Sequence, residues 1–190
     1  MPKAQSTLYV IGGCNGAGKT TFAREFLPSV GVRRFLNADE IARGLSPLDP
    51  QALRLRAGRL LLGELRDLIG RGESFGVEST RSGRTYVHLF RHAKERSYAI
   101  ELHFIWLADP REAIRRVRQR VREGGHDVPA ADVRRRFARG LKHLVSDYAP
   151  LADEWFVWDN SSPPATLLAQ SGTQTIVELA KLVTPDEERL

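Results

Sequence analysis

The residues best suited to chemistry lie near the start of the chain, in the segment LYVIGGCNGAGKTT at residues 8–21. A short, β-rich apolar run leads directly into glycines, a lysine and two threonines. From Gly13 the spacing fits G-x-x-x-x-G-K-[ST], a loop whose backbone N–H groups surround the phosphates of a nucleotide. The residues predicted to bind the nucleotide are Gly13, Asn15, Gly16, Ala17, Gly18, Lys19, Thr20 and Thr21.

Two side chains of this loop have predicted roles of their own. Lys19 would reach the β- and γ-phosphates, and the Thr20 hydroxyl would hold Mg²⁺. The next segment, TTFAREFL, has a helical pattern, so the partial positive charge of a helix N-terminus would lie behind the phosphates. The only cysteine, Cys14, lies inside the loop, where we expect it to fill space rather than to react.

Carboxylates follow two of the predicted strands. Asp39 ends the segment 32–39 and Glu78 lies in the segment 74–80, and in a parallel sheet both would lie at the same edge as the loop. A carboxylate there can bind Mg²⁺ or take the proton of an attacking hydroxyl. Two alternatives remain open: Asp39 as a helix N-cap and Glu78 as a solvated acid. For Asp109, in WLADP, capping is the preferred interpretation, with Pro110 at the first helical position.

Ten arginines lie between residues 111 and 139. Two helices are predicted there, at 110–122 and 130–146, each with an apolar stripe that would pack on the protein. Arginines away from the stripes would form a lid over a nucleotide, because the planar guanidinium binds phosphate oxygens and stays charged. A solvated face and a nucleic-acid surface are the alternatives, but no exposed aromatics are interleaved, which favours polyphosphate. His126, in the loop between the helices, is either structural or a substrate contact.

The composition bounds the class of protein. The chain has 190 residues with a net charge of +6, and 42% of its residues are hydrophobic, which suits one globular domain over 1–190. The sequence shows neither an apolar run of about 20 residues nor a signal-like N-terminus, which predicts a cytoplasmic protein with no membrane contact.

The remaining elements are those that must position these residues. Helices are predicted within 50–72 and 83–97, and strands at 98–110 and 154–161, while 163–190 is an ambiguous extension that could hold a hairpin. Strands that alternate with helices predict a three-layer α/β fold in which helices flank a parallel sheet. Ligands of such sheets bind at the carboxyl ends of the strands.

Taken in order, five motifs resemble the zeta-toxin-like family of P-loop kinases, closest to its short bacterial branch. They cover residues 7–162 and read GGCNGAGKTT, FLNADEIARGL, FGVESTRSGRT, RVRQRVREGGHDVPAADVRRRFARG and VWDNS. The resemblance implies a P-loop NTPase fold of nucleotide-kinase type, ATP and Mg²⁺ as cosubstrate, and phosphoryl transfer to a small hydroxyl compound. Zeta toxins phosphorylate UDP-N-acetylglucosamine and are restrained by an antitoxin protein.

The same resemblance assigns individual roles. Asp39 matches the acid that activates the acceptor hydroxyl, and Glu78 and Thr80 match residues on the acceptor side. Arg120 and Arg136 are the lid arginines of choice, with Arg116 and Arg135 left open. Asp159 and Asn160 fall in a loop that would lie near the adenine.

The chain also departs from the family pattern. It is shorter than zeta toxins, lacks their added C-terminal helices, and its GGHDVP segment does not match their arginine spacing. A nucleotide-sugar acceptor and an antitoxin therefore follow less directly than ATP-dependent phosphoryl transfer. The alternatives are a polynucleotide-end kinase and a nucleotide-dependent switch ATPase without a phosphorylated acceptor.

Overall fold

A computed structural model describes residues 5–78, 85–124 and 128–183 of the chain. Its centre is a six-stranded sheet in the order β2-β3-β1-β4-β5-β6. The strands are β1 (Thr7–Gly13), β2 (Phe35–Leu36), β3 (Phe75–Glu78), β4 (Ala99–Trp106), β5 (Glu154–Asp159) and β6 (Thr166–Gln170). The first five run parallel and β6 pairs antiparallel with β5.

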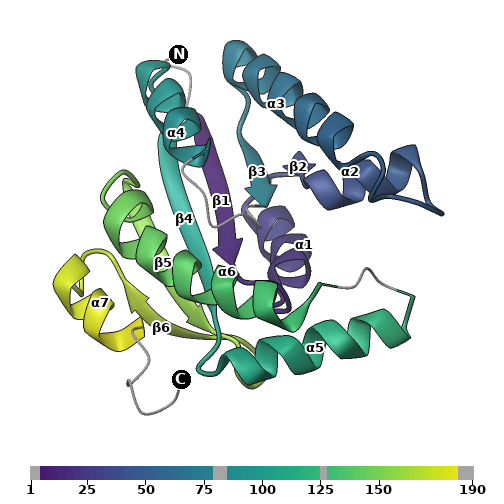
Figure 1. Ribbon diagram of the computed structural model, residues 1–190. Helices are drawn as coiled ribbons and strands as arrows, with labels where there is room; N and C mark the ends of the chain where they lie inside the picture. The colour runs from purple at the N-terminus through teal and green to yellow at the C-terminus, as the bar shows by residue number, and fades with distance from the viewer. Residues whose placement is uncertain (1–4, 79–84, 125–127, 184–190) are drawn as a thin grey trace.

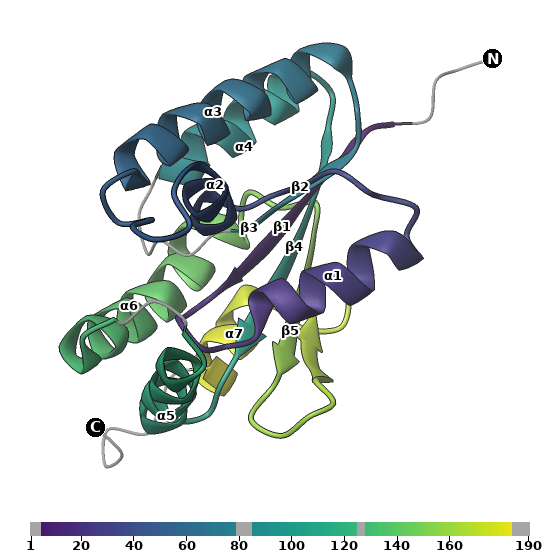
Figure 2. The ribbon, with the colours of Figure 1, turned by 90° about the vertical axis from the view of Figure 1, so that its right-hand side faces the viewer.

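The helices cover both faces of this sheet, which confirms the predicted α/β class. They are α1 (Lys19–Ser29), α2 (Ala38–Leu45), α3 (Arg54–Arg71), α4 (Thr85–Glu95), α5 (Pro110–Arg122), α6 (Ala130–His143) and α7 (Ile176–Val183). Helix α1 lies on one face, whereas α4 and α6 lie on the other (Figures 1 and 2). Within the described ranges, no helix combines the length and the apolarity that a membrane crossing requires.

The sheet and helices form because their apolar residues have the matching periods. In the central strand β1, Leu8, Val10 and Ile11 are buried, as expected of a strand covered on both sides. In α3 the buried side chains recur at helical spacing from Ala57 to Ile69. Gly72 ends this helix in the left-handed conformation, with φ of 66°.

Two boundaries differ from the sequence-based prediction. The second strand is only Phe35–Leu36, because Asn37 already caps α2. The predicted helix at 130–146 ends at His143 and continues as a π-helical turn, Leu144–Tyr148.

The C-terminal segment is not a separate hairpin. Strand β6 pairs with β5, and the residues that follow form α7 instead of a second strand. The sheet is therefore parallel, as predicted, except at this edge strand, whose structure the sequence left open. Antiparallel pairing becomes possible because the connection from β5 to β6 is short and needs no helical crossover.

Candidate active site

The phosphate-binding loop joins β1 to α1 at the carboxyl end of the sheet, and packing explains two of its glycines. Gly16 has φ of 81°, and a Cβ there would lie 2.6 Å from the carbonyl oxygen of Ala113 in α5. Gly18 has φ of 93°, and a Cβ there would lie 2.5 Å from Nδ2 of Asn160. Only glycine satisfies both the backbone conformation and the close approach at these positions.

Lys19 and Thr20 begin α1 and both contact Glu78, at the end of the neighbouring strand β3. Lys19 Nζ donates to the carbonyl oxygen of Cys14 at 2.8 Å and lies 3.7 Å from Glu78 Oε1, with both side chains 4% exposed. The Thr20 hydroxyl donates to Glu78 Oε2 at 2.6 Å. Glu78 is thus a buried partner of the loop, not the solvated acid left open by the sequence.

These oxygens fit a Mg²⁺ site. Mg²⁺ takes oxygen ligands, and beside nucleotides it uses one or two protein ligands together with phosphates and waters. The Thr20 hydroxyl and the Glu78 carboxylate supply such a pair directly beside the loop. Within the described ranges, no group of three or more His, Cys, Asp or Glu side chains could hold a metal ion by itself. The donor set therefore suits a cation that arrives with a nucleotide.

Asn37 is a residue of the candidate site that the sequence analysis missed. Its Oδ1 accepts the N–H groups of Asp39 at 2.8 Å and Glu40 at 3.3 Å, which caps α2. Its Nδ2 donates to Glu78 Oε2 at 2.7 Å. The alternative that Asp39 caps the helix is therefore wrong. An Asn at the end of a strand before a helical pattern is a recognisable cap signal.

Two adjoining cavities meet at Asp39. The first, of about 230 Å³, lies over the phosphate-binding loop and is called here the phosphate cavity; Lys19, Thr20 and Glu78 line it. The second, of about 220 Å³, lies among α2, the α2–α3 connection, α5 and α6, and is called the acceptor cavity after the role proposed for it below. The side chains that line both cavities are Asn15, Asp39, Arg43 and Arg120.

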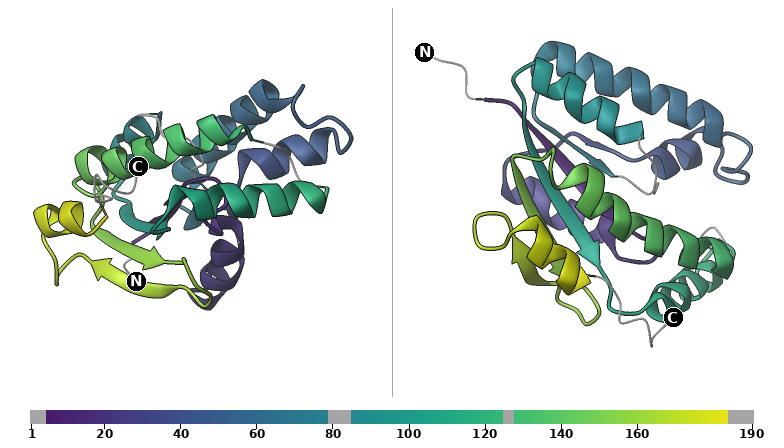
Figure 3. Two further views of the ribbon diagram at one scale, coloured as in Figure 1. Left: turned by 60° about the horizontal axis from the view of Figure 1, so that its bottom comes forward. Right: turned by 60° about the vertical axis from the view of Figure 1, so that its left-hand side comes forward.

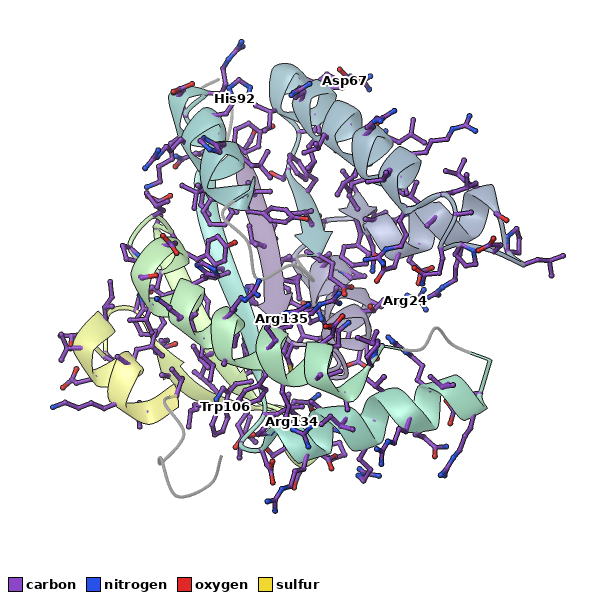
Figure 4. All side chains as sticks on the ribbon, viewed as in Figure 1. Arg24, Asp67, His92, Trp106, Arg134 and Arg135 are labelled. Atoms are coloured by element: carbon purple, nitrogen blue, oxygen red, sulfur yellow. The ribbon has the colours of Figure 1, made fainter. Side chains whose placement is uncertain are left out.

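The structure distinguishes the lid arginines that the sequence left open. Arg120 lines both cavities, and Arg136 lines the acceptor cavity and donates to Asn15 Oδ1 at 3.2 Å. Arg135 is 53% exposed and pairs with Asp132 at 2.7 Å. Figure 4 shows Arg134 and Arg135 projecting from α6, and Figure 3 shows α5 and α6 side by side.

Arg116 connects α5 to the turn after β5. It lines the phosphate cavity, but its guanidinium binds Glu112 at 2.6 Å and the carbonyl oxygens of Asn160 and Ser161 at 2.8 and 3.1 Å. Hydrogen bonds from Arg115, and then from Arg116, lower the pKa of Glu112 to about 2.

The predicted cap at Asp109 is also present, because its Oδ1 accepts the Arg111 N–H at 2.7 Å.

The turn after β5 is hydrogen-bonded to the phosphate-binding loop. Asn160 Nδ2 donates to the carbonyl oxygen of Ala17 at 2.8 Å, and Asp159 Oδ1 accepts the N–H of Ser161 at 2.8 Å. Neither Asp159 nor Asn160 lines the two cavities.

Other predictions have simpler outcomes. Burial raises the pKa of the Cys14 thiol to about 11, which keeps it protonated, as expected of a space-filling residue. Thr80 and His126 lie outside the described residues. Arg43 and Arg54, which line the acceptor cavity, were missed. Arg43 follows Asp39 by one helical turn, which is a usable signal, whereas nothing local marks Arg54.

The family of the chain follows from comparison with known proteins. A family model described as AAA domain (AAA_33) matches residues 8–142. An uncharacterized protein of Haemophilus influenzae is 30% identical over 125 residues, which span 66% of this chain and 88% of that protein.

Solved structures share the fold. One is from the PezAT chromosomal toxin–antitoxin system of Streptococcus pneumoniae, with a TM-score of 0.69 and 15% identity over 100% of this chain and 82% of that one. A chain of the AvrRxo1-ORF1:-ORF2 complex has a TM-score of 0.73 and 17% identity, over 96% of this chain and 65% of that one. Shikimate kinase from Acinetobacter baumannii has a TM-score of 0.50 and 15% identity, over 94% of this chain and 90% of that one. At these identities the likeness to solved structures establishes the fold alone, that of P-loop kinases. The sequence match shows the family: the chain belongs to the AAA_33 family.

Proposed function

We propose that this protein transfers the γ-phosphoryl group of ATP to a hydroxyl group of a small acceptor. The observation that carries the proposal is the pair of adjoining cavities that share Asp39 and Arg120. A phosphate cavity alone would suit any nucleotide-binding protein. A second cavity that meets it at a carboxylate and an arginine suits a reaction between two bound molecules.

The phosphate cavity holds the nucleotide in this proposal. The backbone of the loop and Lys19 bind the phosphates, while Thr20 and Glu78 would hold Mg²⁺. A bound ion would supply positive charge that neutralises the phosphates during transfer. Asn37 keeps the Glu78 carboxylate oriented toward Thr20 through its 2.7 Å hydrogen bond.

The acceptor hydroxyl lies at Asp39. The Asp39 carboxylate takes the hydroxyl proton while the acceptor oxygen bonds to the γ-phosphorus and the bond to the β–γ bridging oxygen breaks, leaving ADP. Arg120, which lines both cavities, lies where it can neutralise charge on the transferring group. Because Asn37 uses its own side chain as the cap, the Asp39 carboxylate is available for this role.

UDP-N-acetylglucosamine is our first proposed acceptor, and an antitoxin protein is the proposed partner. The motif resemblance to zeta toxins supports both. The fold shared with a protein of the PezAT toxin–antitoxin system is consistent with them.

The test is mass spectrometry of a reaction that contains the protein, ATP, Mg²⁺ and UDP-N-acetylglucosamine or another hydroxyl compound. A product heavier by one phosphoryl group is expected. Asp39→Asn should lower kcat by about 10²- to 10⁴-fold, because general base catalysis contributes that much. Asp67→Asn is the matched control, since Asp67 lies on α3 away from the cavities (Figure 4). ATP hydrolysis without a phosphorylated product from any acceptor would favour a switch ATPase instead.

One observation supports a second candidate, a polynucleotide-end kinase. In α5 the exposed residues Arg111, Arg115, Arg118 and Arg122 recur at helical spacing on one face. Such a row could follow a phosphate backbone. Oligonucleotide binding whose affinity falls steeply with salt, together with labelled 5′ ends, would establish this activity; binding that ignores salt would exclude the row as its cause.

A further inference from the structure

The outer side of α3 carries apolar residues that the fold does not cover. This helix lies on the outside of the molecule and turns its buried side chains, from Ala57 to Ile69, toward the protein (Figures 1 and 2). On the side turned away, Leu55 is 75% exposed and Leu62 is 38% exposed. At about 3.6 residues per turn, six exposed residues share that side, and they are called here the α3 outer face. They are Leu55, Arg59, Leu62, Gly63, Arg66 and Gly70.

The residue types of the α3 outer face repeat at intervals of seven, in three matched pairs. The pairs are Leu55 with Leu62, Arg59 with Arg66, and Gly63 with Gly70. An interval of seven returns to nearly the same side of a helix, so each type occurs twice along one stripe. A stripe of this period is complementary to a second helix that lies along α3.

The two glycines of the face have no packing role within the chain. A Cβ added at Gly63 or Gly70 would meet nothing within 4 Å in the rest of the protein, and neither residue has a positive φ. Glycine weakens a helix relative to alanine, so these positions destabilise α3 without a gain inside the molecule. A bare backbone does allow another helix to approach closely. Beside exposed leucines, the glycines therefore favour a helix as the occupant.

The charge of the face favours an acidic occupant. Arg59 and Arg66 are its charged residues, and in the described part of the chain neither forms an ion pair. On one flank, Arg56 and Asp67 carry opposite charges, so the face itself stays positive. A second copy of the chain on the same face would bring like arginines together, which opposes self-association. Carboxylates at a seven-residue interval would instead pair with both arginines.

We propose that the α3 outer face binds a protein partner through an amphipathic helix whose apolar stripe is flanked by acidic residues. The leucines pack on that stripe, the glycines allow its close approach, and the arginines pair with its carboxylates. The surface is separate from the candidate active site, because its six residues lie outside the linings of both cavities. The inference therefore does not rest on the proposed function.

The experiment selects helices without fixing their charge in advance. A phage-displayed library of helices of about three heptads has leucine or isoleucine at the apolar positions and either glutamate or lysine at the flanking positions. The whole protein is the bait. Glutamate should be enriched over lysine at the flanking positions. Equal enrichment, enrichment of lysine, or the absence of any selected helix would overturn the inference.

Variants then test whether a selected helix binds at this face, with affinity measured by isothermal titration calorimetry. The double variant Arg59→Gln, Arg66→Gln should weaken binding by about fivefold, as expected for two exposed ion pairs. Leu55→Gln should weaken it by about tenfold or more, because apolar contact is lost. Leu182→Gln is the matched control, since Leu182 is 45% exposed on α7, and it should bind as the wild type does. Equal affinity of the wild type and the arginine double variant would contradict the proposal.

The glycines provide a test that separates binding from stability. The double variant Gly63→Ala, Gly70→Ala should raise Tm by about 4 °C, because alanine favours the helix. The same variant should bind the selected helix about tenfold more weakly, because the added methyl groups overpack the contact. Unchanged binding in this variant would contradict the close approach of a helix.

Two other occupants of the face are measured directly. A dimer in sedimentation velocity that Leu55→Gln converts to a monomer would assign the face to a second copy. Cosedimentation with phosphatidylglycerol vesicles that Leu55→Gln abolishes would assign it to a membrane surface. Either result would overturn the inference, whereas a monomer that does not bind these vesicles is expected.

Discussion

The phosphate cavity and the acceptor cavity are similar in volume, about 230 and 220 Å³, but they are built differently. Half of the residues that line the phosphate cavity lie in one continuous segment, residues 15–21, and the others come from the ends of β2 and β3, from α2 and from α5. The acceptor cavity gathers side chains from α2, the α2–α3 connection, α5 and α6. Half of the residues that line the first are consecutive or nearly so in the chain, whereas those of the second come from separate elements. A motif can therefore specify the first, whereas packing must assemble the second.

The largest effect is expected at Lys19, which belongs wholly to the phosphate cavity. Lys19→Ala should abolish phosphoryl transfer, by about 10³-fold or more, because it removes the cation beside the transferring phosphates. The measurement is product formation, with circular dichroism to verify the fold. Lys94→Ala is the control, since Lys94 forms an exposed ion pair with Asp153. Turnover that survives in Lys19→Ala would mean that the loop does not hold the reacting nucleotide.

Variants of Arg120 and Arg116 test which of these two arginines of α5 acts on the reaction and which on stability. Arg120→Gln should lower kcat by about 10³-fold, the lower range for an arginine on a transferring phosphoryl group. Arg116→Gln should instead lower Tm by about 2 to 4 °C, because its bonds to Glu112 and to the carbonyl of Asn160 hold α5 in place. Kinetics and thermal melts of both variants separate the roles. A larger loss of turnover in Arg116→Gln would reverse the assignment.

Asn37 links the Glu78 carboxylate to the helix that carries Asp39. Asn37→Ser keeps a capping oxygen but loses the donor to Glu78, so we expect about a tenfold higher Mg²⁺ requirement with little change in Tm. Asn37→Ala should lose stability as well, by about 1 kcal/mol for the cap. The readout is turnover as a function of Mg²⁺ concentration. An unchanged Mg²⁺ dependence in Asn37→Ser would reduce Asn37 to a cap.

The smallest effect concerns the support of α5 behind the phosphate cavity. The folded pKa of Glu112 is lowered to about 2, so the carboxylate stabilises the fold above its unfolded pKa, about 4.3. That contribution is lost as pH falls from about 4.5 toward 2. Glu112→Gln should therefore show a shallower fall of Tm over this range, by about 2 to 4 °C. An equal fall of Tm with pH in the variant and the wild type would show that the Glu112 carboxylate contributes nothing measurable to stability.

The sequence allowed much of the fold to be predicted, and its failures have identifiable causes. The apolar periods of β1, β4 and α3 are long and regular, and their positions were predicted within a few residues. The secondary structure of the 163–190 segment was not predicted, because a short apolar run such as TLLAQ does not show whether a strand pairs parallel or antiparallel with its neighbour. Only the neighbouring strand β5 decides that β6 runs antiparallel.

By itself, the sequence determined the phosphate-binding loop, the two arginine-bearing helices and the acids at the strand ends. These features depend on local backbone conformation and on residue spacing, which the chain carries from one residue to the next. Only the tertiary structure decided that Glu78 contacts Thr20, that Asn37 joins Glu78 to α2, and that Arg120 rather than Arg135 lines both cavities. These contacts join residues far apart in the chain, and side chains meet across such distances only where the packing of helices against the sheet brings them together.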